Sequence, residues 1–444
     1  MIELTITKTD ADRIASEVLS GETEQCAVLF ASRAVRVDGR LRFIVRKVEI
    51  PGPESYSQRS VATAELNPAF VAKVSKSARI QGDSIVFVHS HPGEAPPAFS
   101  RVDDMGEARL ASFLAVRTPG VLHGAMVISA GGWVGRQLGT SEPMKIVSLG
   151  ERRNVLFDPT NPNELVPQIF DRQIRAFGEA GQRLIQSLTV AIVGLGGTGS
   201  VAAEQLAHLG VRQFILIDPD EVELTNLNRV VGATKSDVGR AKIGVAADHI
   251  LAIAPEASVR CVRGDVTRAY VAKELILADF IFSCTDSHGS RAIVQQIAYQ
   301  YLIPCIDVGS LLTSVDGRVT GIYGRIQALT PGLPCFTCSG LIDAEEVRQD
   351  MMNEWERRLD PYIQGAREPA PAVISINSTV TSLAITMFMA MTVGIPSEGR
   401  YLLYNAKAPS LRSVTASANP TCYICSPSGV LGRGDAQALF AREE

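Results

Sequence analysis

The sequence predicts an α/β protein with an N-terminal α/β domain and a larger nucleotide-binding domain whose sheet is mainly parallel. Three observations lead to this fold class. The chain has 444 residues, which is long enough for two or three domains. Residues 1–140 alternate short apolar runs with two helix-period patterns. The stretch Leu188–Arg229 contains a β-branched run, four closely spaced glycines and a helix-period pattern, which together predict a strand, a tight turn and a helix.

The N-terminal domain is predicted to span residues 1–140. Its apolar runs have the length and composition of strands, and two further segments carry apolar residues at helix spacing. The expected strands are residues 26–31, 42–50, 84–91 and 124–130, and the expected helices are Asp10–Leu19 and Val102–Val116. Because strands and helices alternate, this segment is expected to fold as a separate α/β domain.

The strand over residues 84–91 ends in two histidines. Alternation along a strand puts His89 and His91 on one face. Asp103 opens the next helix and offers a carboxylate oxygen. Two imidazole nitrogens and one carboxylate leave a fourth position for water, as catalytic zinc requires. The pattern therefore predicts a catalytic zinc site, whereas His123 lies outside it and is expected to be a core or surface histidine.

This domain resembles the JAMM (JAB-type) metallopeptidases, whose signature is an upstream Glu, then HxHP, a short loop and SxxD. The matching segments are Glu24, His89 to Pro92 and Ser100 to Asp103. The resemblance implies that Glu24 is the general base for a zinc-bound water and that Ser100 stabilises the tetrahedral oxyanion. The loop before Ser100 has eight residues, where the family usually has seven. The alternative is a domain that keeps the fold without its metal.

Residues 141–167 are predicted to be a linker, because they carry several charges and repeated prolines. The second domain is expected to cover residues 168–430, with a C-terminal tail over residues 431–444. Its first strand, Thr189–Val193, leads into Gly194, Gly196, Gly197 and Gly199. Glycine lets backbone amides approach a phosphate closely, and the N-terminus of the next helix adds partial positive charge. A nucleotide is therefore expected at this turn of a Rossmann-like domain.

Further candidate nucleotide residues follow in order along the chain. Asp218 ends the strand Gln213–Ile217, where a carboxylate can hold ribose hydroxyls. Arginine and lysine near a triphosphate neutralise charge on the α-phosphate and the pyrophosphate, and an aspartate at the end of a strand can hold magnesium. The candidates are Arg229 in NLNR, Lys242 in GRAK and Asp286 in CTD. Asn226 belongs to the same NLNR motif and is a further candidate. Together they predict nucleotidyl transfer from ATP, with Mg2+.

The order of these motifs resembles the ubiquitin-activating-enzyme-like adenylyltransferases of the ThiF/MoeB type. Their pattern is GxGGxGS, DxDxVxxxNLxRQ, GxxK and CTDNxxxR, and here Val230 and Ser287 replace the usual Gln and Asn. The resemblance covers roughly residues 169–428. That family also carries an arginine at the position of Arg172, and in the family this arginine reaches the nucleotide of the partner subunit. The resemblance thus implies a phosphate contact and a homodimer, and the alternative for Arg172 is a surface ion pair.

Two C-x2-C pairs predict a structural zinc site, because four thiolates close the coordination shell of a tetrahedral ion. The four residues are Cys335, Cys338, Cys422 and Cys425. No cysteine lies between Cys338 and Cys422, so no thioester is expected on this chain. The remaining thiols, at 26, 261, 284 and 305, are expected in strands as small buried hydrophobes.

Composition restricts the class of partner and the compartment. A net charge of −4 argues against a general nucleic-acid binder. The charged amino terminus does not resemble a secretory signal, and no stretch is expected to reach the length of a membrane span. The longest apolar candidate, Leu383–Ile395, is predicted to be a buried helix. We expect a cytoplasmic protein without a membrane partner.

The two resemblances together imply one substrate protein. The adenylation domain would activate the C-terminal glycine of a ubiquitin-like or sulfur-carrier protein, and the JAMM domain would expose that glycine from a precursor or release it from a conjugate. A conjugating enzyme or a sulfurtransferase would then take the activated carrier. Two alternatives are a biosynthetic role in sulfur transfer, and an inactive JAMM domain that serves only to dock the carrier.

Overall fold

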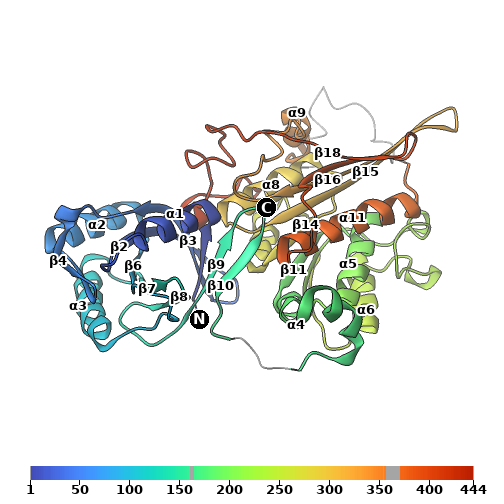
Figure 1. Cartoon of the computed structure of the whole chain (residues 1–444). Coiled ribbons are helices and arrows are strands. Elements are labelled where there is room, and N and C mark those ends of the chain that lie inside the picture. Colours follow the sequence, from blue (N-terminus) through green and yellow to red (C-terminus); the bar gives the residue numbers. More distant parts are fainter. Residues whose placement is uncertain (1, 161–164, 354, 357–370, 444) are drawn as a thin grey trace. The chain divides into compact units, whose positions relative to one another are not determined.

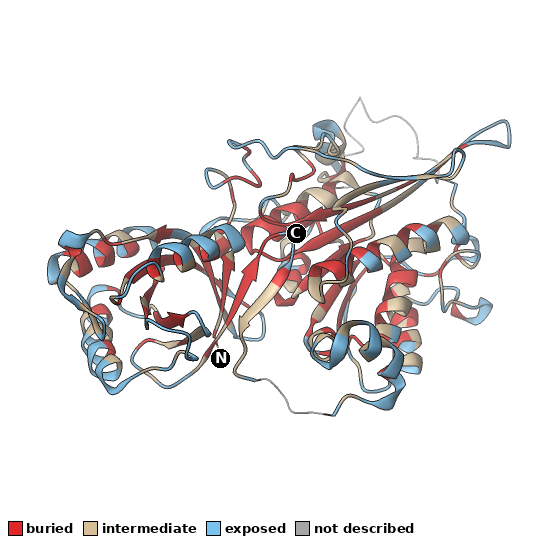
Figure 2. Cartoon of the chain, viewed as in Figure 1, coloured by how far each residue is buried: buried red, intermediate tan, exposed pale blue. Residues whose placement is uncertain are grey.

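The computed structural model describes residues 2–160, 165–353, 355–356 and 371–443. The chain forms two compact units (Figure 1). Unit 1 comprises Met1–Asn163, Gln300–Leu302 and Val430–Ala438, and unit 2 comprises Glu164–Tyr299, Ile303–Gly429 and Leu439–Glu444. Each unit has a large sheet whose central strands are buried (Figure 2). The architecture is therefore mixed α/β, as the sequence predicts.

Unit 1 is built on an eight-stranded mixed sheet in the order β10-β9-β1-β3-β2-β6-β7-β8. Its strands are β1 Ile2–Thr7, β2 Cys26–Val35, β3 Leu41–Glu49, β6 Ser84–Ser90, β7 Gly124–Ser129, β8 Gly132–Gln137, β9 Met144–Leu149 and β10 Arg153–Phe157, with a separate hairpin of β4 Tyr56–Ser60 and β5 Thr63–Leu66. Its helices are α1 Lys8–Val18, α2 Pro68–Gln81 and α3 Arg101–Arg117.

Helices cover both faces of this sheet. Alternate side chains of β2 separate the two cores: Ala27 and Leu29 join the cluster that contains Ile14 of α1. Val28 and Phe30 join the cluster that contains residues of α2 and α3. A sheet buried on both faces needs apolar residues at consecutive positions, which explains why β2 reads as a continuous apolar run.

Two predicted boundaries differ from the structure. The segment predicted as a linker over residues 141–167 contains β9 and β10, which extend the sheet beyond β1. Its prolines lie outside these strands, at Pro143 and after residue 157, and residues 161–164 are outside the described part. Residues 431–438 of the predicted tail belong to unit 1. Within unit 1, the Ser32 hydroxyl donates to the Gly432 carbonyl at 2.6 Å.

Unit 2 contains a second eight-stranded sheet in the order β13-β12-β11-β14-β15-β16-β17-β18. Its strands are β11 Thr189–Val193, β12 Gln213–Ile217, β13 Ser258–Val262, β14 Phe280–Ser283, β15 Cys305–Val315, β16 Arg318–Leu329, β17 Tyr401–Asn405 and β18 Ser410–Ser413. Its helices are α4 Asp171–Ser187, α5 Gly197–Leu209, α6 Lys242–Ile253, α7 Ala269–Ala272, α8 His288–Gln300, α9 Ala344–Asp350 and α11 Ile374–Thr392.

The sheet of unit 2 changes direction at β15. The pairs from β13 to β15 are parallel, whereas β16, β17 and β18 pair antiparallel. The sequence predicts a mainly parallel sheet with a pair of strands over residues 319–329, but that segment is the single strand β16. Helices α5, α6 and α11 cover one face in a shared core (Figure 1). The carboxyl ends of β11, β12 and β14 meet at one edge, where a nucleotide binds in such folds.

Helix α11 has the length and hydropathy of a membrane span. It has 19 residues and a mean hydropathy of 1.4, so the prediction that no stretch reaches this length is wrong. Half of that apolar stretch is buried inside the protein. Phe388 lies edge-on to Phe280 of β14, with ring centroids 4.8 Å apart. α11 is therefore a core helix of unit 2. A buried core helix can have the same length and hydropathy as a membrane span.

His123 is a core histidine of unit 1, the first of the two roles left open by the sequence. Its Nδ1 accepts a hydrogen bond from the Ile85 amide at 3.0 Å, so the ring proton is on Nε2, which lies 2.8 Å from the Thr118 hydroxyl. Burial, followed by the charge of Arg33, lowers the pKa of His123 to about 4. The site is therefore built for a neutral imidazole.

We predict that His123 makes the stability of unit 1 depend on pH. The folded pKa of about 4 lies below the unfolded value of about 6.5, so the unfolded chain takes up the proton first as the pH falls. The stabilisation is complete above about pH 6.5 and is lost towards pH 4, with about 2 kcal/mol lost by pH 5.

The measurement is urea unfolding at pH 7.5 and 5.0 in a Trp355→Phe background, so that fluorescence reports Trp133 of β8. Between pH 7.5 and 5.0, the free energy of unfolding of His123→Gln should fall by about 2 kcal/mol less than that of the protein with His123. Equal drops in the histidine and glutamine proteins would contradict the prediction.

Candidate functional site

The glycine turn connects β11 to α5 and is held by Asp218. Gly194 has φ +87°, a conformation that favours glycine, and a side chain at Gly199 would lie 1.8 Å from the Gly194 carbonyl oxygen. The Asp218 carboxylate accepts hydrogen bonds from the amides of Leu195 at 2.6 Å and Asp220 at 2.8 Å. Burial raises the pKa of Asp218, although the Leu195 amide and the charge of Lys242 oppose this shift. Asp218 thus fixes the turn, and its contact with ribose stays a prediction.

The N-terminus of α5 presents backbone amides to this edge. Gly196 occupies the cap position, and no side chain among the described residues caps the helix. A side-chain carbon at Gly196 would meet no heavy atom within 4 Å, so the space beside this cap residue is open. A side chain at Gly197 would lie 2.0 Å from Nδ2 of Asn377, which comes from the first turn of α11. Open amides at the start of a helix are suited to phosphate.

Arg229 approaches the same turn from the loop after β12. Its Cδ would lie 3.6 Å from a side-chain carbon at Gly197. Its Nη1 donates to the Thr225 carbonyl at 2.7 Å, which fixes the guanidinium. Asn226 is buried, and its Oδ1 accepts from the Glu223 amide, which caps the short turn η3, Leu224–Asn226. Asn226 therefore shapes the loop that presents Arg229.

Lys242 and Asp286 complete the set. Lys242 is the first residue of α6, and its Nζ lies 2.8 Å from the carboxylate of Asp220, with a side chain only 12% exposed. Asp286 is exposed in the loop between β14 and α8. Sequence reasoning assigned no role to Asp220, the second Asp of the DxDxV pattern, or to Asn377. Asp220 lies two residues beyond the predicted Asp218, whereas Asn377 carries no local signal because it is 180 residues away from the turn it contacts.

The structure thus gathers the predicted nucleotide residues of unit 2 around the carboxyl edge of β11, β12 and β14. The Arg229 guanidinium lies beside the glycine turn, the Lys242 ammonium pairs with Asp220 after β12, and an exposed carboxylate follows β14. Cationic and amide donors stabilise charge on transferring phosphoryl groups, and a carboxylate fits Mg2+. Arg172 lies exposed at the start of α4, so its contact with a partner subunit stays a prediction.

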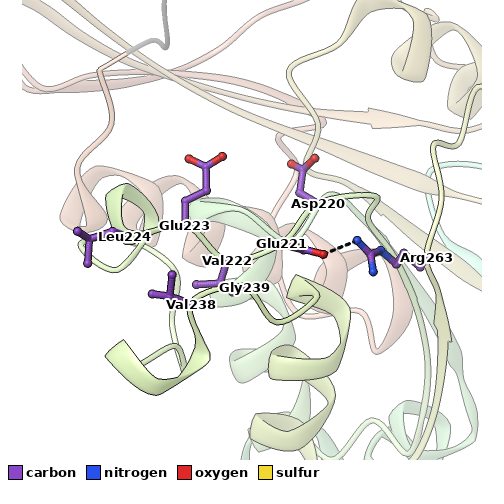
Figure 3. Close-up of a pocket in the computed structure, with 8 residues that line it drawn as sticks. All are labelled: Asp220, Glu221, Val222, Glu223, Leu224, Val238, Gly239 and Arg263. Atoms are coloured by element: carbon purple, nitrogen blue, oxygen red, sulfur yellow. Dashed lines mark hydrogen bonds and ion pairs between the residues drawn. The ribbon is translucent and has the colours of Figure 1, made fainter.

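A pocket of about 730 Å³ lies beside this edge (Figure 3). Figure 3 shows Asp220, Glu221 and Glu223 around it, with Glu221 paired to Arg263 at 2.7 Å. None of its lining residues belongs to the glycine turn. Asp220 is paired with Lys242 and Glu221 with Arg263, so the lining keeps a net negative charge, which suits a triphosphate less well than the amides of α5.

Unit 2 also contains the predicted four-cysteine cluster. The sulfur atoms of Cys335 and Cys422 are 3.6 Å apart, as are those of Cys338 and Cys425. All four lie within 4.8 Å of one another, and the thiols are free. Zinc–sulfur bonds of about 2.3 Å in a tetrahedron place sulfur atoms about 3.8 Å apart. The donor set and its spacing therefore fit a structural zinc ion, with all four positions filled by protein.

The other cysteines correct one sequence expectation. Cys26 and Cys305 are buried, as predicted, but Cys261 on the edge strand β13 is exposed, and Cys284 lies just after β14 and not within it. Burial raises the pKa of Cys284 to about 12, and burial followed by the charge of Asp248 raises that of Cys261. Neither thiol is in an environment that favours the thiolate.

In unit 1, His89, His91 and Asp103 converge as predicted. The two Nε2 atoms are 3.2 Å apart, and Asp103 oxygens lie 3.0 Å from His89 Nε2 and 3.7 Å from His91 Nε2. Zinc–nitrogen bonds of about 2.0–2.1 Å in a tetrahedron place ligand atoms about 3.3 Å apart. The three residues thus fit three corners of a tetrahedral site.

Two further residues complete this constellation. Ser100 caps α3, with its hydroxyl accepting from the Asp103 amide while its own amide donates to the Asp103 carboxylate at 2.6 Å. This capping box fixes the carboxylate beside the histidines. The Glu24 carboxylate lies 3.9 Å from His91 Nε2. Burial raises the pKa of Glu24, against the charge of His89, so this carboxyl is more basic than usual. The roles implied for Glu24 and Ser100 stay predictions.

Comparisons with known proteins cover unit 2. The model of the ThiF family matches residues 170–424, more than half of the chain. The chain is 28% identical over 260 residues to the molybdopterin-synthase adenylyltransferase of Escherichia coli K12, covering 58% of this chain and 95% of that protein. It is 26% identical over 253 residues to the SAMP-activating enzyme E1 of Haloferax volcanii, covering 57% and 86%. A crystal structure of E. coli MccB with ATP has 21% identity and a TM-score of 0.46, covering 60% and 76%.

The four-cysteine cluster generates a prediction for zinc. Cys422→Ser should lose one zinc ion per chain, because serine replaces one of four thiolates, and should lower the free energy of unfolding by several kcal/mol. Elemental analysis and thermal unfolding measure both effects. Cys261→Ser, at an exposed thiol outside the cluster, is the control and should keep the wild-type zinc content. An unchanged zinc content in Cys422→Ser would contradict the assignment.

Proposed function

This chain belongs to the ThiF family, and from that premise we propose that unit 2 transfers AMP from ATP to the C-terminal glycine of a ubiquitin-like or sulfur-carrier protein. The observation that carries the proposal is the convergence of Arg229, Lys242 and the open N-terminus of α5 at one sheet edge. The relatives support the substrate class: one is a molybdopterin-synthase adenylyltransferase and another a SAMP-activating enzyme.

The proposed reaction joins two anions. A carboxylate oxygen of the carrier attacks the α-phosphorus of ATP, the bond from that phosphorus to the bridging oxygen breaks, and pyrophosphate leaves. Arg229 and Lys242 neutralise the charge that develops on the α-phosphate and the leaving group, and the amides of α5 orient the phosphates. Asp286 would hold a magnesium ion, which supplies further neutralisation when bound. The product is an acyl-adenylate on the carrier.

We propose that the adenylate leaves for a separate protein, either a conjugating enzyme or a sulfurtransferase. The described thiols outside the zinc cluster are buried or have raised pKa values where a shift is resolved, so they are poor nucleophiles. We also propose a homodimer in which Arg172, exposed at the start of α4, contacts the nucleotide of the partner subunit.

For unit 1, we propose a JAMM-type zinc peptidase that exposes or releases the same C-terminal glycine. The spacing of His89, His91 and Asp103 supports it, as does the raised pKa of Glu24. The zinc ion polarises a water molecule when bound. Glu24 would accept the proton of that water and pass it to the leaving amine, while the Ser100 hydroxyl would donate to the oxyanion.

The adenylation proposal predicts that pyrophosphate exchange with ATP requires a carrier. Each ubiquitin-fold protein of the same organism that ends in Gly-Gly is supplied in turn. Asp286→Ala should slow exchange by a factor of order 10² or more, because the magnesium ligand is lost, and Lys242→Ala should behave similarly. The control Glu256→Ala removes an exposed carboxylate after α6 and should exchange at the wild-type rate. Unchanged exchange in Asp286→Ala would refute the proposal.

The peptidase proposal predicts two zinc ions per chain, of which one is catalytic. The double change His89→Ala and His91→Ala should remove one zinc ion and abolish cleavage of a carrier extended beyond its final glycine, while pyrophosphate exchange persists. His208→Ala, at an exposed histidine of α5, is the control. If the double variant keeps both zinc ions or still cleaves, the peptidase assignment fails. If wild-type protein binds zinc without cleaving, unit 1 serves only to dock the carrier.

A further inference from the structure

A buried carboxylate in unit 2 binds two arginines, and no single sequence motif contains both. Asp307 of β15 has a fully buried side chain. Its Oδ1 accepts from Nε of Arg291 at 3.2 Å and from the Ser283 hydroxyl at 2.9 Å, and its Oδ2 accepts from Nη2 of Arg325 at 2.5 Å. Arg291 comes from α8, Arg325 from β16 and Ser283 from β14, so with β15 four elements meet at this carboxylate.

The cluster carries an excess positive charge. Two guanidinium groups face one carboxylate, and the arginine side chains are only 13% and 17% exposed. Guanidinium groups stay protonated in proteins, so the excess charge is permanent. A largely buried excess charge is costly unless an opposite charge joins it. The cluster is therefore complementary to a monoanion.

The two guanidinium groups converge over Gly309. This glycine lies directly opposite Arg325 in the β15–β16 register. A side-chain carbon at Gly309 would lie 3.7 Å from Nη2 of Arg325, 3.8 Å from Nη2 of Arg291 and 3.9 Å from Nε of Arg325. Within the described ranges, Nη2 of Arg291 and Nε of Arg325 make no hydrogen bond. The missing side chain thus leaves a space bordered by nitrogen donors of two arginines.

This space adjoins the nucleotide edge. Nη1 of Arg291 donates to the carbonyl of Asp286 at 3.3 Å, and β15 pairs with β14, the strand that leads to Asp286. The triphosphate already has a separate set of donors in α5, Arg229 and Lys242. A planar carboxylate with one charge matches guanidinium forks that carry one excess charge.

We propose that Arg291 and Arg325, oriented by Asp307, bind the carboxylate that is adenylated, in the space over Gly309. This inference rests on the proposed function of unit 2. When the carboxylate oxygen attacks the α-phosphorus and pyrophosphate leaves, the acyl group loses its negative charge, so its attraction to the arginines weakens. No proton moves in this step. Asp307 acts as a positioning residue, because its carboxylate accepts hydrogen bonds from the two arginines and Ser283 within the protein.

The test uses one variant that fills the space and one that removes the excess charge. Gly309→Ala places a methyl group at ordinary van der Waals distance from both guanidinium groups without changing any charge. Arg325→Gln leaves Arg291 and Asp307 as a neutral pair. The matched controls are Gly244→Ala, where a methyl group on α6 meets nothing within 4 Å, and Arg318→Gln, at an exposed arginine of the same strand.

The first measurement is independent of any carrier. Triglycine labelled with 13C at its carboxylate is mixed with full-length protein and a non-hydrolysable ATP analogue, and the line width of the labelled carbon is recorded. Wild-type protein and both controls should broaden the line, whereas Gly309→Ala and Arg325→Gln should not. Circular dichroism checks that the variants are folded. Equal broadening in all folded variants, or none with wild-type protein, would overturn the inference.

The second measurement separates this inference from the proposed function. In pyrophosphate exchange, both variants should raise the KM for the carrier by about tenfold or more, because hydrogen bonds to a charged group are lost, while the KM for ATP stays unchanged. Variants that raise both KM values equally would indicate a structural role and overturn the carboxylate site. Absence of exchange in wild-type protein counts against the adenylation proposal, and the line-width measurement still decides the carboxylate site.

Discussion

The nucleotide edge of unit 2 depends on one buried carboxylate. Asp218 ends β12 and accepts hydrogen bonds from the amides of Leu195, in the glycine turn, and Asp220. A buried acceptor without its donors would cost free energy, so the turn, the strand end and the following loop are fixed together. In that loop, the Asp220 carboxylate pairs with Lys242, and the chain then continues to Arg229. The positions of the cationic groups near the glycine turn therefore depend on hydrogen bonds that Asp218 makes within the protein.

Adenylation has to bring a carboxylate and a triphosphate together, although both are anions. Unit 2 offers two separate groups of donors, one beyond the carboxyl ends of β11 and β12 and the other beside the middle of β15 and β16. We propose that Arg229, Lys242 and the amides of α5 bind the phosphates, whereas Arg291 and Arg325 border the space over Gly309. Separate sites of positive charge reduce the repulsion between the reacting anions without merging their binding sites. In the proposed reaction, Asp307 keeps the second pair in place, and the acyl group, neutral once it is adenylated, no longer matches that pair.

The two candidate metal centres differ in how many ligands the protein supplies. Four cysteine sulfurs in unit 2 fill a tetrahedral shell, which suits a structural ion. In unit 1, two histidines and an aspartate fill three corners, with the buried Glu24 carboxylate beside them. A site with an open corner and a basic carboxyl nearby is suited to activating water. The chemistry that each centre can support therefore differs for reasons of ligand number alone.

The sequence by itself determined the features that depend on short spacing. The glycine turn, the pair His89 and His91, the helix start at Asp103 and both C-x2-C pairs depend on residues a few positions apart, where strand and helix periods fix which side chains share a face. It misplaced β9 and β10 because prolines flank apolar strands there, and it missed the exposure of Cys261 because burial of an edge strand depends on distant elements. Only the tertiary structure decided the contacts of Asn377 with the glycine turn and of Arg325 with Asp307, because long-range packing and strand register, which no local pattern encodes, bring these residues together.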